Sequence, residues 1–168
     1  EAYVAFAEDD ALRLVRRHPN VVILRTLSKS HALAGLRLGF AVAQPAVIEG
    51  LAKVKDSYNV GAAAACVGAA AIRDVAYTVD VAARIRASRS RLGSAPEGMG
   101  RHVWPSQANF LLVRPPGEDA EGVSRELEAR GILVRYFPDS PRLADCLRIS
   151  IGTDDDMDLL LKVLKRLV

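Results

Sequence analysis

The spacing of hydrophobic and polar positions predicts a mixed α/β layout in the first part of the chain. The expected strands cover residues 2–6, 21–24 and 38–43, and the expected helices cover 10–17, 46–55, 61–74 and 75–91. The first strand, helix and strand form a β-α-β pattern, the unit of a parallel sheet. The third helix is dominated by alanine and contains glycine, so its backbone is expected to press close to a neighbouring element.

The pattern changes near Gly93, where the segment GSAPEGMG (93–100) is predicted to be a linker. The elements expected after it are strands over 109–113, 132–136 and 146–151, and a helix over 118–130 that stops at Gly131. The last helix has the clearest start, because Thr153 is a candidate N-cap followed by three aspartates. Its predicted apolar stripe consists of Met157, Leu160, Leu161 and Leu164. We therefore expect two domains, residues 1–92 and a smaller α+β domain over 93–168.

Composition and charge narrow the functional classes. The 168 residues are 50% hydrophobic and 26% charged, which is enough for a core in one large or two small domains. The net charge of +3 comes from 23 basic residues scattered among 20 acidic ones, which argues against a nucleic-acid-binding patch. The densest basic run is interpreted as a solvated helix face: Arg84, Arg86, Arg89 and Arg91. Nucleic-acid binding through this helix is the weakest alternative.

The two cysteines, Cys66 and Cys146, lie far apart in apolar surroundings and are expected to be reduced core thiols. No His/Cys/Asp cluster has metal-ligand spacing, so no metal is expected. No apolar run reaches membrane-spanning length and no signal peptide is visible. These features favour a cytoplasmic protein without a membrane partner. The sequence also opens at Glu1 without methionine, directly in a strand-like run, which predicts a chain cut inside a domain.

The segment RTLSKSHALAGLRLGF, residues 25–40, contains the strongest candidate for chemistry, Lys29. Lysine amines are mostly protonated in water, so a nucleophilic lysine needs a site that desolvates it or places positive charge beside it. Strands are expected on both sides of this segment, so the chain turns back over a sheet edge there. The groups on the turn that suit a phosphate are small hydroxyls and a fixed cation: Thr26, Ser28, Ser30 and Arg37. An aldehyde beside a phosphate is pyridoxal phosphate.

Six motifs together resemble a known family. They are, in order, EAYVAF, RTLSKSHALAGLRLGF, YNVGAAAA, SQANFLLVR, GILVRYF and LRISIGT. In this order and spacing the chain resembles the C-terminal half of histidinol-phosphate aminotransferases, which are fold-type I pyridoxal-phosphate enzymes. The resemblance implies an α/β fold: the C-terminal part of the large cofactor-binding domain, with a sheet flanked by helices, and then the small α+β domain. It also implies a homodimer that acts on small molecules, namely an amino acid or amino-alcohol phosphate and a 2-oxo acid.

The resemblance assigns cofactor roles to four residues. Lys29 matches the lysine that forms the Schiff base with pyridoxal 5'-phosphate and later acts as general base between the substrate Cα and the cofactor. Ser28 and Arg37 match ligands of the cofactor phosphate, and Tyr3 matches the tyrosine whose hydroxyl bonds the phenolic oxygen of the cofactor. Without the resemblance, Tyr3 would be interpreted as a packing residue. His31 occupies a position that is commonly aromatic in the family, so we interpret it as a packing residue or as a support for a neighbouring side chain, not as a catalytic residue.

Three further residues match substrate-binding positions of the family. Arg148 matches the arginine that anchors the carboxylate of glutamate or 2-oxoglutarate, and Arg135 matches an arginine that contacts the substrate phosphate. Asn109 matches a residue close to the active-site mouth and is given a supporting role. From the sequence alone, both arginines could instead form structural ion pairs.

The resemblance predicts transamination of histidinol phosphate with 2-oxoglutarate, a step of histidine biosynthesis, because two arginines suit one phosphate and one carboxylate. An aromatic-amino-acid aminotransferase or a threonine-phosphate decarboxylase is an alternative function, although the motif LAGLRLGF argues mildly against the decarboxylase. A non-catalytic dimerisation or binding module is the alternative from another class. The sequence lacks the motifs of the family's N-terminal half and the aspartate before EAY that pairs with the pyridine nitrogen. We therefore expect little or no activity from this chain alone.

Overall fold

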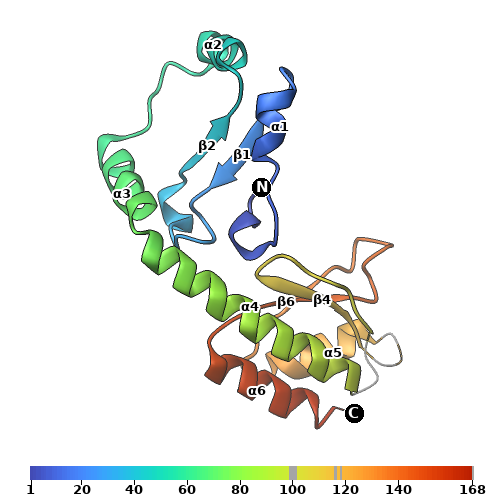
Figure 1. Ribbon diagram of the computed structural model, residues 1–168. Coiled ribbons are helices and arrows are strands. Elements are labelled where there is room, and N and C mark those ends of the chain that lie inside the picture. Colours follow the sequence, from blue (N-terminus) through green and yellow to red (C-terminus); the bar gives the residue numbers. More distant parts are fainter. Residues whose placement is uncertain (99–101, 116, 118, 168) are drawn as a thin grey trace. The chain divides into compact units, whose positions relative to one another are not determined.

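The computed structural model describes residues 1–98, 102–115, 117 and 119–167 (Figure 1). The chain separates into two compact units, Glu1–Ala82 and Ala83–Val168. We call them unit 1 and unit 2 and describe each by itself. The domain boundary that the sequence suggested after residue 92 stays a prediction.

Unit 1 combines a two-stranded sheet with helices. Its elements are a 3₁₀ helix Val4–Phe6, α1 Leu12–Arg17, β1 Ile23–Thr26, a 3₁₀ helix Ala34–Leu36, β2 Gly39–Val42, α2 Pro45–Val54, α3 Ala62–Arg73 and the beginning of α4, Val75–Gly98. β1 and β2 pair antiparallel, with Ile23 opposite Val42 and Thr26 opposite Gly39. The segment that contains Lys29 therefore leaves and re-enters the sheet at the same end.

The strand expected over residues 2–6 is wrong. These residues form a tight turn, in which the N–H of Phe6 donates to the carbonyl of Tyr3 (2.9 Å) and the N–H of Ala7 donates to that of Val4 (3.0 Å). The Phe6 side chain is fully buried, and this packing outweighs the strand propensity of the run. The expected parallel β-α-β unit is wrong for the same reason. Without a first strand, α1 joins no pair of strands, and β1 pairs antiparallel with β2.

The turn that contains Lys29, residues 27–38, connects β1 to β2, and we call it the Lys29 turn. The alanine-rich helix α3 packs closely against both ends of this turn, as expected for a helix that presses its backbone against a neighbour. Gly68 is the buried residue of this helix. A Cβ at that position would overlap Cδ2 of Leu38 and would lie 3.3 Å from Cδ1 of Leu27. The missing side chain is what permits this approach. Cys66, two residues earlier, is exposed, so the prediction that it is a core thiol is wrong.

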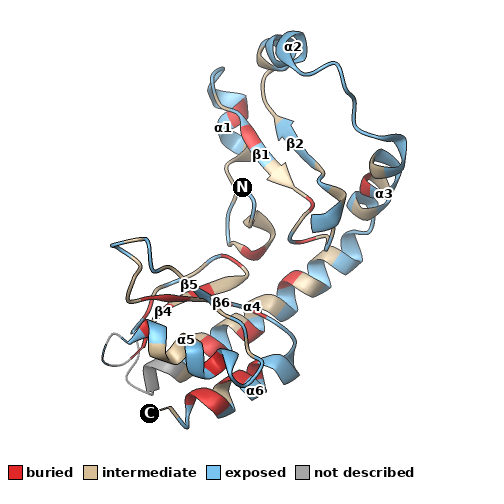
Figure 2. Ribbon diagram, turned by 180° about the vertical axis from the view of Figure 1, so that it is seen from behind, coloured by how far each residue is buried: buried red, intermediate tan, exposed pale blue. Residues whose placement is uncertain are grey.

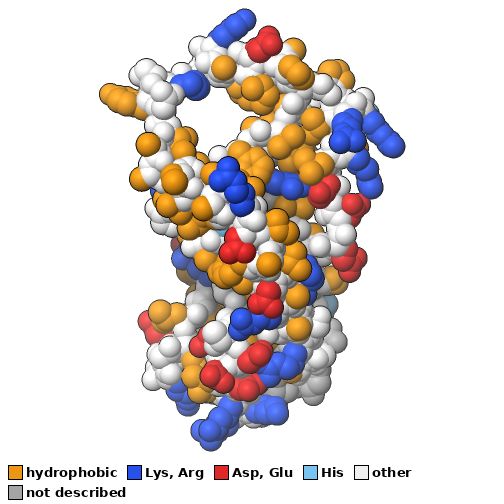
Figure 3. All heavy atoms as spheres, turned by 60° about the vertical axis from the view of Figure 1, so that its left-hand side comes forward, with side chains coloured by type: hydrophobic (Ala, Val, Ile, Leu, Met, Phe, Trp, Pro, Cys, Tyr) orange, Lys and Arg blue, Asp and Glu red, His pale blue; other side chains and the backbone are white. Residues whose placement is uncertain are grey.

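Many hydrophobic side chains of unit 1 are not covered. Helix α2 has no buried residue, and α3 buries Gly68 alone. The large hydrophobic residues exposed on and between α2, α3 and the start of α4 are Ile48, Leu51, Val54, Tyr58, Val60, Val67, Ile72, Val75, Tyr77 and Val79. In the space-filling view, hydrophobic side chains accordingly reach the surface over much of unit 1 (Figure 3).

Unit 2 contains a four-stranded antiparallel sheet with the order β3-β4-β6-β5. Its elements after the second part of α4 are β3 His102–Val103, β4 Phe110–Arg114, α5 Ala120–Glu128, β5 Arg135–Tyr136, β6 Leu147–Ser150 and α6 Asp154–Leu164. The sequence pattern did not predict β3. On one face of the sheet, Leu111 lies opposite Ile149 and Val113 opposite Leu147, and all four are buried. They share one hydrophobic core with residues of α4, α5 and α6 (Figure 2).

The helix ends predicted for unit 2 are confirmed. Helix α6 begins with a capping box, in which Thr153 Oγ1 accepts the N–H of Asp156 (3.3 Å) and the N–H of Thr153 donates to Asp156 Oδ2 (2.9 Å). Three of the four residues predicted for its apolar stripe are buried in the core: Met157, Leu160 and Leu164. The fourth, Leu161, is only partly buried, and Val163, which was not predicted, is also buried there. The chain leaves α5 at Gly131, whose φ of +77° suits glycine.

The linker expected over residues 93–100 is wrong wherever the structure describes it. Helix α4 continues through this segment to Gly98, and residues 99 and 100 lie outside the described part. Leu92 is fully buried in the core of unit 2, so the helix is anchored immediately before the segment. Ser94 Oγ then donates to the carbonyl of Ser90 (3.2 Å), one turn back.

Within the described residues, no helix is by itself long and apolar enough to cross a membrane. Helix α3 and the first part of α4 meet that test only as a pair, by length and composition, and they are bent by 71° where they join.

Candidate functional site

Lys29 lies on an irregular turn whose two ends are fastened to each other. The N–H of Leu27 donates to the carbonyl of Leu38 (3.0 Å), and the Leu27 side chain is buried. Two non-glycine residues of the turn, Ala32 and Arg37, have a φ of 55°, in the left-handed region that such residues rarely adopt. Backbone strain of this kind persists where the surroundings enforce it, and it is frequent at functional sites.

The turn carries the hydroxyls and the cation that the sequence singled out. Thr26 Oγ1 donates to Ser28 Oγ (2.8 Å), and the N–H of Ser28 donates to Thr26 Oγ1 (3.1 Å). Arg37 Nη1 donates to the carbonyl of Ala34 (2.8 Å). The side chains of Lys29 and Arg37 are exposed, and no carboxylate of the described residues forms an ion pair with either of them. Two cations without acidic partners in the described residues, on the same turn as two hydroxyls, are groups that suit an anion.

Tyr3 and Lys29 are brought together from separate segments. Lys29 Nζ lies 6.0 Å from the centre of the Tyr3 ring, at the outer limit of a cation–π contact. Tyr3 is half-buried at the start of the 3₁₀ turn that replaces the expected strand. Unit 1 therefore holds all four predicted cofactor residues on two segments, residues 1–7 and the turn between β1 and β2.

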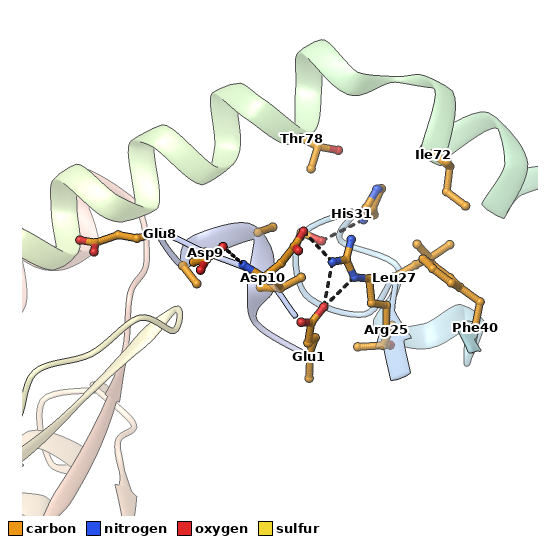
Figure 4. Close-up of a pocket in the computed structure, with 16 residues that line it drawn as sticks. Glu1, Glu8, Asp9, Asp10, Arg25, Leu27, His31, Phe40, Ile72 and Thr78 are labelled. Carbon is orange, nitrogen blue, oxygen red and sulfur yellow. Dashed lines mark hydrogen bonds and ion pairs between the residues drawn. The ribbon is translucent and has the colours of Figure 1, made fainter. Parts of the chain in front are cut away.

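A cavity of about 580 Å³ in unit 1 shares this turn but not these side chains (Figure 4). Its lining includes Glu1, Asp10, Arg25 and His31, whereas none of the four predicted cofactor residues lines it. It is therefore not the site that the sequence predicts. Arg25 forms ion pairs in it with Glu1 (2.8 Å) and Asp10 (3.1 Å). The sequence pattern did not predict this network, although an arginine directly after an apolar strand pattern is a signal for acidic partners.

His31 lies on the cavity side of the turn. Its Nδ1 is 2.9 Å from Ser30 Oγ, and Ser30 is buried. Burial lowers the pKa of His31 from its ordinary value of 6.5, so the neutral ring is favoured near neutral pH. A neutral, hydrogen-bonded ring agrees with the packing role that we assigned to this residue from the sequence.

The two predicted substrate arginines lie on the face of the unit 2 sheet that is turned away from the core. Arg135 in β5 is directly opposite Arg148 in β6, and like charges in such a pair repel each other. The guanidinium carbon of Arg148 lies 5.4 Å from the centre of the Phe110 ring, and that of Arg135 lies 5.6 Å from the Phe137 ring. Arg148 Nε is buried without a hydrogen-bond partner among the described residues.

No carboxylate in the described part of the chain pairs with Arg135 or Arg148. The alternative that they form structural ion pairs therefore gains no support. Two adjacent, unpaired guanidinium groups, each over an aromatic ring, suit a planar carboxylate or a phosphate. Arg114 on β4 provides the contrast, because it does have an acidic partner, Asp145 (2.5 Å).

Asn109 lies beside the end of β6. It is half-buried directly before β4, and its carbonyl accepts the N–H of Ile151 (2.9 Å). This backbone contact fixes its position, and the supporting role of its side chain stays a prediction. Among the residues that the structure describes, no three His, Cys, Asp or Glu side chains come together as a metal site would need.

Comparisons of the sequence point to one family. The model of a family described as "Aminotransferase class I and II" matches residues 1–164. Histidinol-phosphate aminotransferase 1 of Nostoc sp. is 52% identical over 168 residues, which are 100% of this chain and 47% of that protein. Histidinol-phosphate aminotransferase of Geobacter sulfurreducens is 50% identical over 99% of this chain and 47% of its own length. The chain thus spans about half the length of the curated relatives it matches.

Solved structures agree with the sequence comparisons. The histidinol-phosphate aminotransferase from Sinorhizobium meliloti in complex with pyridoxal-5'-phosphate is 30% identical and superposes with a TM-score of 0.83, covering 100% of this chain and 48% of that one. An aminotransferase from Burkholderia pseudomallei is 31% identical with a TM-score of 0.86, covering 99% and 51%. These similarities confirm the predicted fold class.

Proposed function

Because the chain belongs to the aminotransferase class I and II family, we propose that the whole protein is a pyridoxal-phosphate-dependent aminotransferase that acts on histidinol phosphate and 2-oxoglutarate. Relatives that bear the name histidinol-phosphate aminotransferase, at 52% and 50% identity, support this substrate pair. The structural observation that carries the proposal is the Lys29 turn. Its exposed amine lies beside the Tyr3 ring, on the same turn as two hydroxyls and an exposed guanidinium.

The residues of the turn fit pyridoxal phosphate, which carries an aldehyde and a phosphate. Lys29 would bond the aldehyde carbon covalently, with loss of water, because no carboxylate of the described residues pairs with its amine and favours the protonated form. Ser28 and Arg37 would hold the phosphate through a hydroxyl and a guanidinium. The Tyr3 hydroxyl would donate to the phenolic oxygen of the ring. The left-handed backbone conformation at Arg37 fixes the direction in which its side chain extends from the main chain.

Lys29 also supplies the base of the proposed reaction. When bound, pyridoxal phosphate withdraws electrons from the substrate and so makes the Cα proton removable. Lys29 Nζ, on the turn that would hold the cofactor, would act as the base that takes this proton from Cα. The Tyr3 ring, 6.0 Å from this amine, lies on the neighbouring segment.

Arg135 and Arg148 explain how one protein would accept two different substrates. Histidinol phosphate brings a phosphate and 2-oxoglutarate brings carboxylates, and a guanidinium can bind either group through two parallel hydrogen bonds. Arg148 would anchor the carboxylate, Arg135 the phosphate, and Asn109 would support them. Because the two arginines face each other without acidic neighbours in the described chain, a bound anion would relieve their repulsion.

The state and place of the whole protein are part of the same proposal. We propose a homodimer, as the family resemblance implies, in the cytoplasm, where both cysteines would stay reduced. The chain spans about half the length of its relatives, so we expect the 168 residues alone to have little or no activity. The tests below therefore use the whole protein that contains this chain.

The first experiment tests the cofactor and its lysine. The whole protein is loaded with pyridoxal phosphate, reduced with borohydride and digested, and the peptide that keeps the cofactor mass is identified. We expect this peptide to contain Lys29. Lys29→Arg should abolish both the label and the activity, whereas Lys53→Arg, at an exposed lysine of α2, should leave both unchanged. Absence of cofactor uptake by the wild type would favour the non-catalytic binding module.

The second experiment tests the substrate. Histidinol phosphate and phenylalanine are offered in parallel with 2-oxoglutarate, and kcat/KM is compared. A preference for phenylalanine would refute the proposed substrate and favour an aromatic-amino-acid aminotransferase. Arg135→Gln should raise KM for histidinol phosphate more than for phenylalanine, because the variant loses a contact with the substrate phosphate and phenylalanine has no phosphate.

A further inference from the structure

We propose that Arg25 is a positioning residue, which holds the segment of Tyr3 in place beside the turn of Lys29. The inference rests on the proposed function in one respect, namely that Tyr3 and Lys29 belong to the cofactor site. Arg25 itself makes none of the contacts described for Tyr3 or Lys29, and it would act through the backbone segments that carry them.

Arg25 uses its guanidinium to join two acidic residues. Its Nε donates to Glu1 Oε2 (2.9 Å), its Nη2 lies 2.8 Å from the same oxygen, and Nη2 also donates to Asp10 Oδ2 (3.1 Å). Figure 4 shows the two carboxylates converging on the guanidinium from one side. This geometry needs the planar fork of arginine, because a lysine ammonium is a single point charge.

Both carboxylates are tied to the backbone as well. Glu1 Oε1 accepts the N–H of Ala11 (2.6 Å), and Asp10 Oδ1 accepts the N–H of Leu12 (3.0 Å). The main-chain nitrogen of Glu1 donates to the carbonyl of Leu24 in β1 (2.8 Å). Residues 1–12 therefore form a loop that is closed at its base by the carboxylates and pinned to β1 by Arg25.

The position of the network along the chain links it to the site. Tyr3 follows Glu1 by two residues inside the closed loop, and Lys29 follows Arg25 by four residues beyond the end of β1. Leu27, between Arg25 and Lys29, is buried. The guanidinium, together with the bond from Glu1 to Leu24, thus sets the spacing of the two segments whose side chains meet at 6.0 Å.

Partial burial makes this network more than a surface contact. The side chains of Arg25 and Glu1 are 22% and 16% exposed, and that of Asp10 is 40% exposed. The nearby pair of Arg13 and Asp9 is 65% and 70% exposed, and such surface pairs contribute little. Loss of Arg25 would leave a shielded carboxylate at Glu1 without its cation, which the segment can relieve only by moving into water.

The chain offers a matched set of variants for the test. Arg25→Met and Asp10→Asn break the network, whereas Arg13→Met and Asp9→Asn make the same chemical changes in the exposed pair. The first readout is amide hydrogen exchange over residues 2–7 in the whole protein without cofactor. We expect exchange to be at least tenfold faster in Arg25→Met, faster to a smaller degree in Asp10→Asn, and unchanged in both controls.

The second readout is the visible absorbance of bound pyridoxal phosphate as a function of pH. If Arg25 positions Tyr3 against the cofactor, its loss should shift the midpoint of this titration and lower kcat by more than it raises KM. If Arg25 had only a structural role, Arg25→Met would lower the thermal midpoint of unfolding, and the midpoint of its absorbance titration would equal that of Arg13→Met. That result, or equal exchange in Arg25→Met and Arg13→Met, would overturn the proposal.

The two hypotheses fail in different ways. A wild-type protein that takes up no pyridoxal phosphate refutes the proposed function, while the exchange experiment, done without cofactor, still decides whether Arg25 holds the Tyr3 segment. If Arg25→Met does not fold, the milder Asp10→Asn decides in its place, since it removes one charge and keeps the side-chain shape.

Discussion

Replacement of Gly68 by alanine should disturb the Lys29 turn from a distance. Gly68 lies in α3, and a Cβ there would overlap Cδ2 of Leu38 and lie 3.3 Å from Cδ1 of Leu27. These two leucines are the residues whose backbones close the turn (3.0 Å). The methyl group must therefore push either the helix or the closing residues of the turn.

The expected size of the effect follows from two opposing terms. Glycine to alanine inside a helix gains about 1 kcal/mol of helix propensity. Insertion of a methyl group into a packed contact costs about 1–3 kcal/mol. The difference between these two terms is a loss of roughly 0–2 kcal/mol of the free energy of unfolding for Gly68→Ala. Because Leu38 is half-buried and its side chain can turn, we expect a value in the lower part of this range.

Gly50 is the matched control. It lies inside α2, and a Cβ there meets nothing within 4 Å, so Gly50→Ala should gain about 1 kcal/mol. Urea unfolding followed by far-UV circular dichroism, with hydrogen exchange over residues 62–73, would measure both variants. The two should differ by about 1–3 kcal/mol, which is the overpacking term. If Gly68→Ala stabilises the protein as much as Gly50→Ala does, α3 does not pack on the turn as described.

Three further predictions concern single side chains. The pKa of His31 is lowered by burial, so the unfolded chain takes up a proton before the folded one as the pH falls. The free energy of unfolding should therefore decrease from about pH 6.5 down to the folded-state pKa, and it should decrease less in His31→Phe. Parallel curves of stability against pH for the two proteins would contradict this. Burial, with help from the Asp145 carboxylate, raises the pKa of Cys146 to about 11, so a thiol reagent should label Cys66 alone in the native chain and both cysteines in urea; rapid native labelling of Cys146 would refute its burial. Loss of the capping box in Thr153→Ala should cost about 1 kcal/mol, whereas Thr153→Ser should cost little; equal losses in thermal unfolding would show that the hydroxyl is not the cause.

The sequence predicted those elements best whose signals are local. The start of α6 depends on a hydroxyl and a carboxylate three residues apart, and both bonds of the capping box form. The end of α5 depends on one residue, Gly131, that tolerates a positive φ. Such signals can be read without knowledge of the rest of the fold, because the partners of each bond are neighbours in sequence.

The errors arose where distant contacts decide. The run over residues 2–6 has strand propensity, yet it folds into a turn because Phe6 is buried and the acid of Glu1 is held by Arg25. The segment 93–100 contains turn-forming residues, yet α4 continues into it because Leu92 anchors the helix in the core of unit 2. Propensity is a weak prior, and tertiary packing overrides it in both cases.

The residues of the candidate site were predicted from motifs, whereas the ion-pair network that holds their segments in place was not. Lys29, Ser28 and Arg37 stand in one continuous motif, so their common turn could be expected. Arg25 belongs to the same motif, but its partners Glu1 and Asp10 come from the segment that was misinterpreted as a strand. In an extended strand, alternate side chains point to opposite faces, and nothing in the pattern would have directed both acids toward β1.

The uneven burial of the two units explains this division. Unit 2 buries residues from three strands and three helices in one core, and the expected strands β4 and β6 and the start of α6 form there, although β3 and the continuation of α4 to Gly98 were not predicted. Unit 1 has a two-stranded sheet and leaves α2 without a buried residue, and it is the unit in which the expected strand and the parallel pairing were wrong. Its site is held by a few specific devices, namely the close approach at Gly68, the left-handed residue Arg37 and the guanidinium of Arg25. Because these contacts hold the segments that carry the site, single substitutions at these positions should change the chemistry of Lys29 more than substitutions in the core of unit 2.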